Sequence, residues 1–185
     1  MSGRSEHTPI SFPYNPNKAA QAILWLLNSN HGSMDKLKLV KLIFYADRAH
    51  LSKYGRPIVG GNYVAMPHGL VSSPMLDSIN SATPEASLPF VLRDNYICLK
   101  ETIGYDELSE SDREILQEVL DKYGHYNPWQ LRDLTHELQA YKKNYPDPTA
   151  NTSRPLSYDD FFLDLKSTEM LDIIRERQEV VDFLS

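Results

Sequence analysis

The sequence predicts a mainly α-helical α+β fold: a single compact helical domain around a central buried helix, with a small β-hairpin or sheet. Three observations predict this fold. A long apolar run at residues 37–54 is ended by Gly55 and Pro57. Shorter amphipathic segments that begin with good helix caps lie on both sides of this run. Two runs of β-forming residues flank a turn composition at residues 93–95.

The first helix is expected to begin at Asn15 or Asn17 and to end near Asn30. Asparagine is a good N-cap, because its side chain accepts a hydrogen bond from the first turn. The apolar residues behind it recur with the helical period, at Ala19, Ala22, Ile23, Leu26 and Leu27.

The central helix is expected to run from about Met34 to Tyr54, with Ser33 or Asp35 as its cap. Its apolar residues lie on almost every side, whereas a surface helix has a single apolar stripe. This helix is therefore predicted to be the most buried element, packed by the first helix and by the helices around Leu116 and Leu131.

Short strands are expected after the central helix. Residues 62–66 form a strand-like run between a glycine pair and Pro67, and residues 72–81 read as a helix behind a Ser-Ser-Pro start. The runs 90–92 and 96–99 flank Arg93-Asp94-Asn95, so they are predicted to form a hairpin.

The C-terminal half is predicted to be helical. Ser109 and Asn127 are strong caps for two helices, of which the first stops at Gly124. Residues 145–155 read as a loop, and two last helices are expected to open at Ser157 and Ser167.

Length and composition favour one domain. The chain has 185 residues, of which 41% are hydrophobic and 24% charged, which are ordinary values for a globular domain. We expect an N-terminal tail over residues 1–14, followed by a single domain over residues 15–185 that ends in a C-terminal helical extension.

The charge argues against nucleic acid as a partner. With 19 basic and 25 acidic residues the net charge is -6, and the basic residues are interspersed with acidic ones. A transcriptional regulator is therefore disfavoured, and a protein or small-molecule partner is favoured. The single cysteine, Cys98, fits a reducing compartment. No apolar run approaches the roughly 20 residues that span a bilayer, and Met1–Thr8 lacks the apolar segment of a secretory signal. We expect a cytoplasmic protein that does not bind membranes.

The sequence contains few signs of catalytic chemistry. No histidine, cysteine or acidic spacing matches a known metal site, no serine lies in a nucleophile elbow, and Gly60-Gly61 lacks the spacing of a phosphate loop. No metal, cofactor or enzymatic activity is expected.

One polar cluster leaves an alternative open. Asp47 and His50 would share a face of the central helix, and the fold could bring them together with His68 and His136. The alternative function is then a metal-dependent or acid-base hydrolase. We favour a structural role, because buried polar residues usually hydrogen-bond to the backbone or to one another.

Two segments are candidate partner-binding surfaces. Lys38, Lys41, Tyr45 and Arg48 recur at three- and four-residue steps, so they form a basic stripe that either binds an acidic segment or is the solvated edge of a buried helix. The second candidate is the charged C-terminal helix over residues 168–184, which contains Arg175. Its apolar residues either pack on this domain or enter a partner groove, and they are Met170, Leu171, Ile174, Val181 and Leu184. Trp25 and Trp129 are expected mostly to pack in the core and at its edge.

Two blocks of the sequence resemble a known family, the Panacea domain, which includes SocA-like antitoxins and phage-associated GepA-like proteins. The first block comprises Lys41-Leu-Ile-Phe-Tyr-Ala-Asp47, His50-Leu51, Tyr54-Gly-Arg-Pro57, Tyr63-Val-Ala65 and His68-Gly-Leu-Val71. The second comprises Leu116 to Gly124, Pro128-Trp-Gln-Leu131 and Leu134-Thr-His-Glu137. The chain departs from the usual family pattern at Leu70, where proline is common, and at Tyr141, where tryptophan is common.

The resemblance implies the antitoxin of a bacterial or phage toxin-antitoxin system. Such a protein would neutralise a cognate toxin by direct protein binding or as a proteolytic adaptor, so the implied partners are the toxin and, for delivery, a protease or chaperone. It also marks Asp47, His50, His68, Thr135 and His136 as motif residues. The identity of the toxin, the binding face and the oligomeric state do not follow from the sequence.

Overall fold

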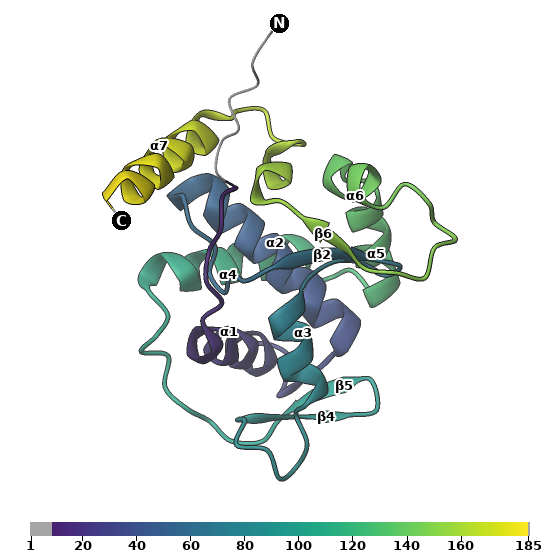
Figure 1. Cartoon of the computed structure of the whole chain (residues 1–185). Coiled ribbons are helices and arrows are strands. Elements are labelled where there is room, and N and C mark those ends of the chain that lie inside the picture. The colour runs from purple at the N-terminus through teal and green to yellow at the C-terminus, as the bar shows by residue number, and fades with distance from the viewer. Residues whose placement is uncertain (1–8, 185) are drawn as a thin grey trace, which may run out of the picture.

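The computed structural model describes residues 9–184 and confirms a mainly helical α+β fold (Figure 1). The helices are α1 (Pro16–Asn28), α2 (Lys36–Tyr54), α3 (Ser73–Asn80), α4 (Glu110–Tyr123), α5 (Pro128–His136), α6 (Gln139–Asn144), the short 3-10 helix η1 (Tyr158–Phe162) and α7 (Glu169–Leu184). The strands are β1 (Ser33–Asp35), β2 (Tyr63–Met66), β3 (Gly69–Ser72), β4 (Phe90–Arg93), β5 (Tyr96–Leu99) and β6 (Arg154–Leu156).

Helix α2 crosses the centre of the molecule, as predicted (Figure 1). Eleven of its nineteen residues are buried, and it contacts α1, α4, α5, α7, β1 and β3. Its two ends are fixed by the residues that the sequence indicated. The Asp35 carboxylate accepts the Lys38 N–H at 3.1 Å, and Gly55 ends the helix in the left-handed conformation with φ 76°. The helix starts after Asp35 because residues 33–35 pair as β1 with strand β5.

The two antiparallel sheets are small. In one, β5 lies between β1 and β4, and the predicted hairpin of β4 and β5 turns at Asp94-Asn95. In the other, β2 lies between β3 and β6. The β2–β3 hairpin turns at Pro67-His68, because Met66 pairs with Gly69. The expectation that residues 145–155 are entirely loop was wrong at its end, because Arg154 and Pro155 pair with β2 as part of β6.

Capping side chains position the outer helices. Asn15 accepts the Lys18 N–H and so begins α1. Ser109 and Asn127 each form a reciprocal capping box, with Asp112 and Gln130. The structure confirms these three predicted helix starts. The helices that they begin, α1, α4 and α5, all contact α2.

Part of the predicted N-terminal tail packs on the domain. The predicted tail covers residues 1–14, and part of it lies outside the described residues. In the described part, Ile10 is buried and the Phe12 carbonyl accepts the Gly61 N–H.

Across residues 9–184, no helix is both long and apolar enough to cross a membrane.

Candidate functional site

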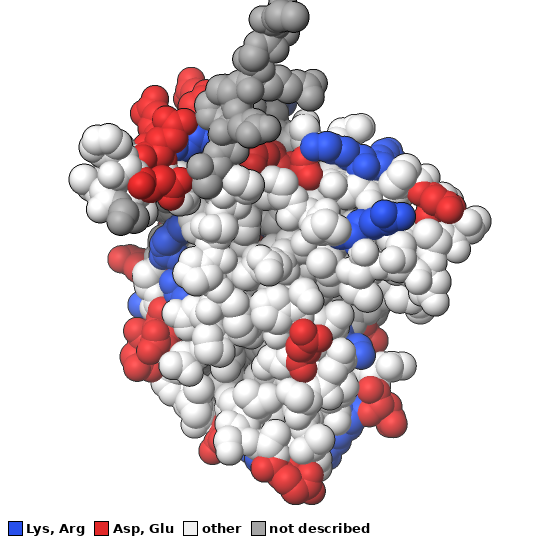
Figure 2. All heavy atoms as spheres, in the orientation of Figure 1, with Lys and Arg blue, Asp and Glu red and all other residues white. Residues whose placement is uncertain are grey.

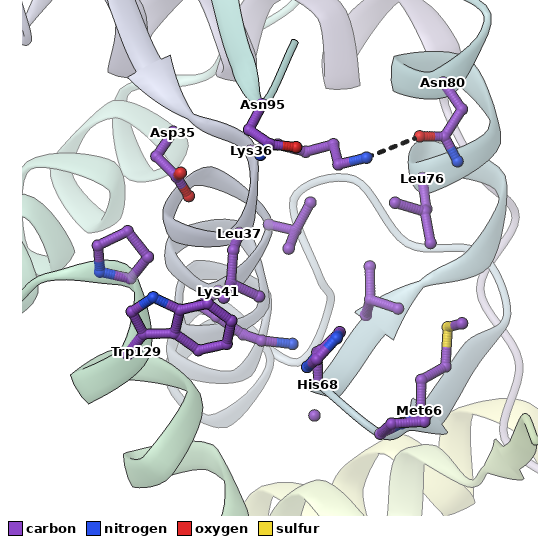
Figure 3. Close-up of a pocket in the computed structure, with 15 residues that line it drawn as sticks. Asp35, Lys36, Leu37, Lys41, Met66, His68, Leu76, Asn80, Asn95 and Trp129 are labelled. Carbon is purple, nitrogen blue, oxygen red and sulfur yellow. Dashed lines mark hydrogen bonds between the residues drawn. The ribbon is translucent and has the colours of Figure 1, made fainter. Parts of the chain in front are cut away.

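A pocket of about 400 Å³ lies beside the N-terminal half of α2, where both family-like blocks contribute side chains (Figure 3). Helix α2, the turn of the β2–β3 hairpin, α3 and the first turn of α5 form its walls. Much of the lining is apolar and comes from Leu37, Val40, Met66, Val71 and Leu76. The pocket therefore joins segments that lie far apart in the sequence.

Lys41 is the central polar residue of this pocket. Its side chain is only 1% exposed, and its ammonium group donates to the Leu70 carbonyl oxygen at 2.9 Å. Among the residues that the structure describes, no acidic side chain forms an ion pair with Lys41. Burial lowers the pKa of Lys41 to about 7.

The turn of the hairpin brings Gly69 against Lys41 and α5. Gly69 has φ 95°, a conformation that glycine adopts readily and other residues rarely. A Cβ at this position would overlap the Thr135 hydroxyl and lie 3.0 Å from the Lys41 Nζ atom. A glycine is thus required here both by the backbone and by the close approach of two side chains.

Trp129 forms the aromatic wall of the pocket and is 55% exposed. The exposed His68 ring and the Trp129 ring are T-shaped, with 5.9 Å between their centroids. The Arg132 guanidinium lies 5.0 Å from the Trp129 ring centroid. The expectation that Trp129 packs in the core or its edge was therefore wrong. Its place in the first turn of α5 directs it outward, beside the pocket (Figure 3).

Thr135 and His136 lie where α5 and α6 approach the hairpin. The buried Thr135 hydroxyl donates to the Arg132 carbonyl at 2.7 Å. The His136 ring stacks on Tyr141 at 4.1 Å, and the Tyr141 hydroxyl donates to the Met66 carbonyl at 3.1 Å. Burial lowers the pKa of His136, and the nearby charges of Arg132 and Lys41 add to this effect. Its buried Nε2 atom has no hydrogen-bond partner among the described residues.

Asp47 lies in a different network, at the turn that follows α2. Its carboxylate accepts the N–H groups of residues 58, 59 and 60 at 2.8, 2.9 and 3.0 Å and the Tyr63 hydroxyl at 2.9 Å. Burial raises the pKa of Asp47 to about 6 although these hydrogen bonds oppose the change. The carboxylate organises the chain between α2 and β2.

His50 belongs to a third network, which ties α2 to the start of α4. Its Nδ1 atom donates to the Arg56 carbonyl at 2.7 Å, and its Nε2 atom lies 3.0 Å from Ser111 Oγ and 3.1 Å from Asp112 Oδ1. The buried Asp112 also pairs with Lys18 at 2.7 Å and Arg56 at 3.0 Å. Burial alone would raise the pKa of Asp112, but hydrogen bonds from His50, Lys18 and Ser109 outweigh it and hold the pKa well below its usual range.

The hydrolase alternative required Asp47, His50, His68 and His136 to converge, and they do not form one site. Asp47 and His50 bond to different partners near the C-terminal end of α2, whereas His68 and His136 lie near the hairpin turn. Within residues 9–184, no group of three or more histidine, cysteine or acidic side chains is arranged to hold a metal ion.

The predicted basic stripe on α2 is not a continuous surface. Lys41 and Tyr45 are buried, so the expectation of a solvated or exposed stripe was wrong for these two residues. Tyr45 stacks on Tyr123 of α4 at 4.2 Å. Lys38 donates to the Gly124 carbonyl at 2.6 Å, and Arg48 donates to the Phe161 carbonyl at 3.1 Å. The helical period placed these residues on one face, but that face packs against α4, η1 and the hairpin.

Helix α7 packs on the domain with its first half only. Leu171 and Ile174 are buried, and Arg175 pairs with Asp159 at 2.5 Å. At the other end, Phe183 is 89% and Leu184 78% exposed. The apolar residues along this helix therefore divide into a buried set near its start and an exposed set at its end.

Sequence reasoning missed Asp112 and the role of Trp129. Asp112 could have been found, because Ser109-x-x-Asp112 is a capping-box spacing and a capping acid at a helix start is a ready partner for buried cations. No sequence signal indicated that Trp129 would line a pocket with Lys41.

Comparison with known proteins identifies the family. Residues 39–142, more than half of the chain, match the model of the family described as antitoxin SocA-like, Panacea domain. The chain matches no curated protein and no solved structure. The matched range contains Lys41, the β2–β3 hairpin and Trp129, so the pocket is built mainly from family residues. The chain belongs to the antitoxin SocA-like, Panacea domain family.

Proposed function

We propose that this protein is the antitoxin of a toxin-antitoxin system and neutralises a cognate protein toxin by binding it directly in the cytoplasm. Membership of the antitoxin family supports this role. The observation that carries the binding mode is the exposed apolar end of α7, formed by Val180, Phe183 and Leu184 at 57%, 89% and 78% exposure.

The position of this apolar end favours a contact with another protein. Leu171 and Ile174 pack the first half of α7 against the domain. The last two turns extend beyond this packed part of the helix (Figure 1). Single exposed apolar residues are ordinary, but a group of large ones usually marks an interaction site. Aromatic residues such as Phe183 are frequent anchors of protein interfaces.

The charge around the apolar end indicates the chemistry of the partner. Glu176, Glu179 and Asp182 lie on the same turns, and Figure 2 shows uncharged surface at this end of α7 beside a group of acidic side chains. A toxin surface that accepts the helix would therefore offer an apolar groove with a basic rim. The helix lies outside the matched range, which ends at residue 142, so it is suited to partner-specific contact.

The other predicted partner contacts have weaker support. Lys38, Arg48 and Arg175 are partly exposed, but each is bonded within the domain. We propose that residues 15–185 act as one binding domain with the end of α7 as its extension, and that the protein acts by binding, without catalysis.

The experiment tests the products of the reading frames that flank this gene as candidate toxins. Expressed alone, the cognate toxin should arrest growth, and co-expression with this protein should restore it. Phe183→Glu should weaken binding about tenfold or more and reduce the rescue, because it places a charge in the apolar contact. Ile103→Glu is the matched control, since Ile103 is another exposed apolar residue, at 37%, in a loop far along the chain from α7.

The amount of intact toxin separates direct binding from proteolytic delivery. Direct binding leaves the toxin level unchanged during rescue, whereas delivery lowers it in cells with an active protease. Rescue by Phe183→Glu equal to that of the unchanged protein would refute the assignment of α7.

A further inference from the structure

The pocket beside α2 holds a buried cation that lacks an anion. A lysine ammonium has three N–H donors, and Lys41 makes one hydrogen bond to the described residues, to the Leu70 carbonyl. Burying an ammonium without an ion-pair partner is unfavourable. A ligand that brings a negative charge to Lys41 would supply the missing partner.

The surroundings of Lys41 favour an anion over a cation. Lys36, Lys41 and His68 line the pocket, and Asp35 is the one acidic residue among the lining residues within the described range. Asp35 is already engaged, since its carboxylate caps α2. In Figure 3 the Lys41 ammonium points toward His68, across the face of the pocket bounded by Trp129.

The walls specify what the rest of the ligand should be. Trp129 is 55% exposed, and aliphatic lining comes from Leu37, Val71 and Leu76. A volume of about 400 Å³ is at the lower end of the range for small-molecule sites. A compact apolar or aromatic group fits this lining, because it would replace water against apolar side chains.

We propose that this pocket binds a carboxylate attached to an apolar or aromatic group, with the carboxylate paired to Lys41 and the apolar group packed against Trp129. Two sources offer this chemistry: a free small organic acid, and the carboxyl-terminal residue of a peptide chain. The proposal does not depend on the proposed function, because it concerns a different face from the end of α7.

A carboxylate ligand would favour the charged form of the Lys41 side chain. Burial lowers the pKa of Lys41 to about 7, and a carboxylate beside it would favour its charged form. A charge-assisted hydrogen bond between ammonium and carboxylate is stronger than a neutral one. His68 lies at the exposed mouth of the pocket, so the ligand has a direct route to solvent.

The test follows the indole N–H of Trp129 and the amide of Gly69 by NMR during titration with 3-phenylpropanoate. An acid of this size should bind in the millimolar range, about 1 to 10 mM. Its neutral analogue, 3-phenylpropanamide, should bind about tenfold more weakly or not at all. For the second source, a short acetylated peptide that ends in a free phenylalanine carboxylate is compared with the same peptide amidated.

Variants assign the two halves of the ligand. Lys41→Met keeps the length and apolar stem of the side chain and should weaken binding of the acid about tenfold or more. Lys53→Met, on the same helix but 45% exposed, is the matched control and should leave binding unchanged. Trp129→Ala removes an exposed side chain, so it should keep the fold while weakening binding, and it decides the case if Lys41→Met does not fold.

Tighter binding of the peptide acid than of 3-phenylpropanoate identifies a chain terminus as the ligand, and the reverse order identifies a free acid. The proposal is overturned if neither acid shifts the Trp129 and Gly69 signals, if the amides bind as tightly as the acids, or if Lys41→Met binds as the unchanged protein does. None of these results bears on rescue by α7, so failure here is distinguishable from failure of the antitoxin assignment.

Discussion

Replacement of Lys41 by methionine should stabilise the protein at low pH, and this advantage should largely disappear at high pH. Burial lowers the pKa of Lys41 from 10.5 to about 7, so the folded state opposes its protonation. Each tenfold difference in proton affinity between the two states corresponds to about 1.4 kcal/mol, so the charged lysine lowers the free energy of unfolding by at most about 5 kcal/mol. Methionine removes this penalty but leaves the Leu70 carbonyl without its donor, which costs about 1 to 3 kcal/mol.

The sign of the pH dependence follows from proton counts. Between pH 7 and 10.5 the unfolded chain holds the Lys41 proton and the folded chain has lost it, so the wild-type free energy of unfolding rises with pH in this window. The methionine variant lacks that contribution. It should be more stable than wild type by about 2 to 4 kcal/mol near pH 6, and its advantage should fall by about 3 kcal/mol by pH 9.5.

Urea unfolding followed by circular dichroism at about pH 6 and about pH 9.5 measures both values. Titrations of other groups cancel in the difference between the two proteins. Lys53→Met, which alters an exposed lysine of the same helix, should show no such pH dependence. A difference between Lys41→Met and wild type that stays constant across the two pH values would refute the unpaired, buried charge.

Three further predictions concern the core and its polar networks. Phe44 is fully buried, so Phe44→Ala should reduce the free energy of unfolding by about 3 to 5 kcal/mol, and an unchanged thermal melt would contradict this. Asp47→Ala leaves three backbone N–H groups and the Tyr63 hydroxyl without an acceptor. The free energy of unfolding, measured with urea, should fall by about 3 kcal/mol or more, while the protein that remains folded should still bind toxin. Because the pKa of Asp112 is held below its usual range, its stabilisation is present above about pH 4 and is lost as the pH falls further. Asp112→Asn should therefore flatten the acid dependence of unfolding, and identical acid profiles for variant and wild type would exclude this role.

Much of the fold could be predicted because local signals and tertiary packing agree. Asp35 and Gly55 mark the ends of α2 by capping alone, and Asp94-Asn95 has the turn composition of the β4–β5 hairpin. The strands β1 and β6 have three residues each and form only by pairing with distant strands. Such short segments carry little pattern of their own, so their register could not be read from the sequence.

The candidate site was harder to predict, for reasons that lie in tertiary structure. Lys41 follows the spacing of surface charges, and only the packing of the hairpin and α5 over α2 buries it. The large aromatic ring of Trp129 suggested packing, whereas its place in the first turn of α5 leaves it exposed. Asp47 and His50 were expected to be structural, and this role stays a prediction: Asp47 bonds to the backbone, and His50 bonds to the backbone and contacts Asp112.

We propose that this protein neutralises a toxin through the exposed apolar end of α7. Isothermal titration calorimetry measures the affinity of the purified full chain for the flanking-gene product that arrests growth, for wild type, Phe183→Glu and Ile103→Glu. Wild type and Ile103→Glu are expected to bind stoichiometrically, and Phe183→Glu is expected to lose about tenfold or more in affinity with an unchanged melting temperature. Equal affinities for Phe183→Glu and Ile103→Glu would contradict it.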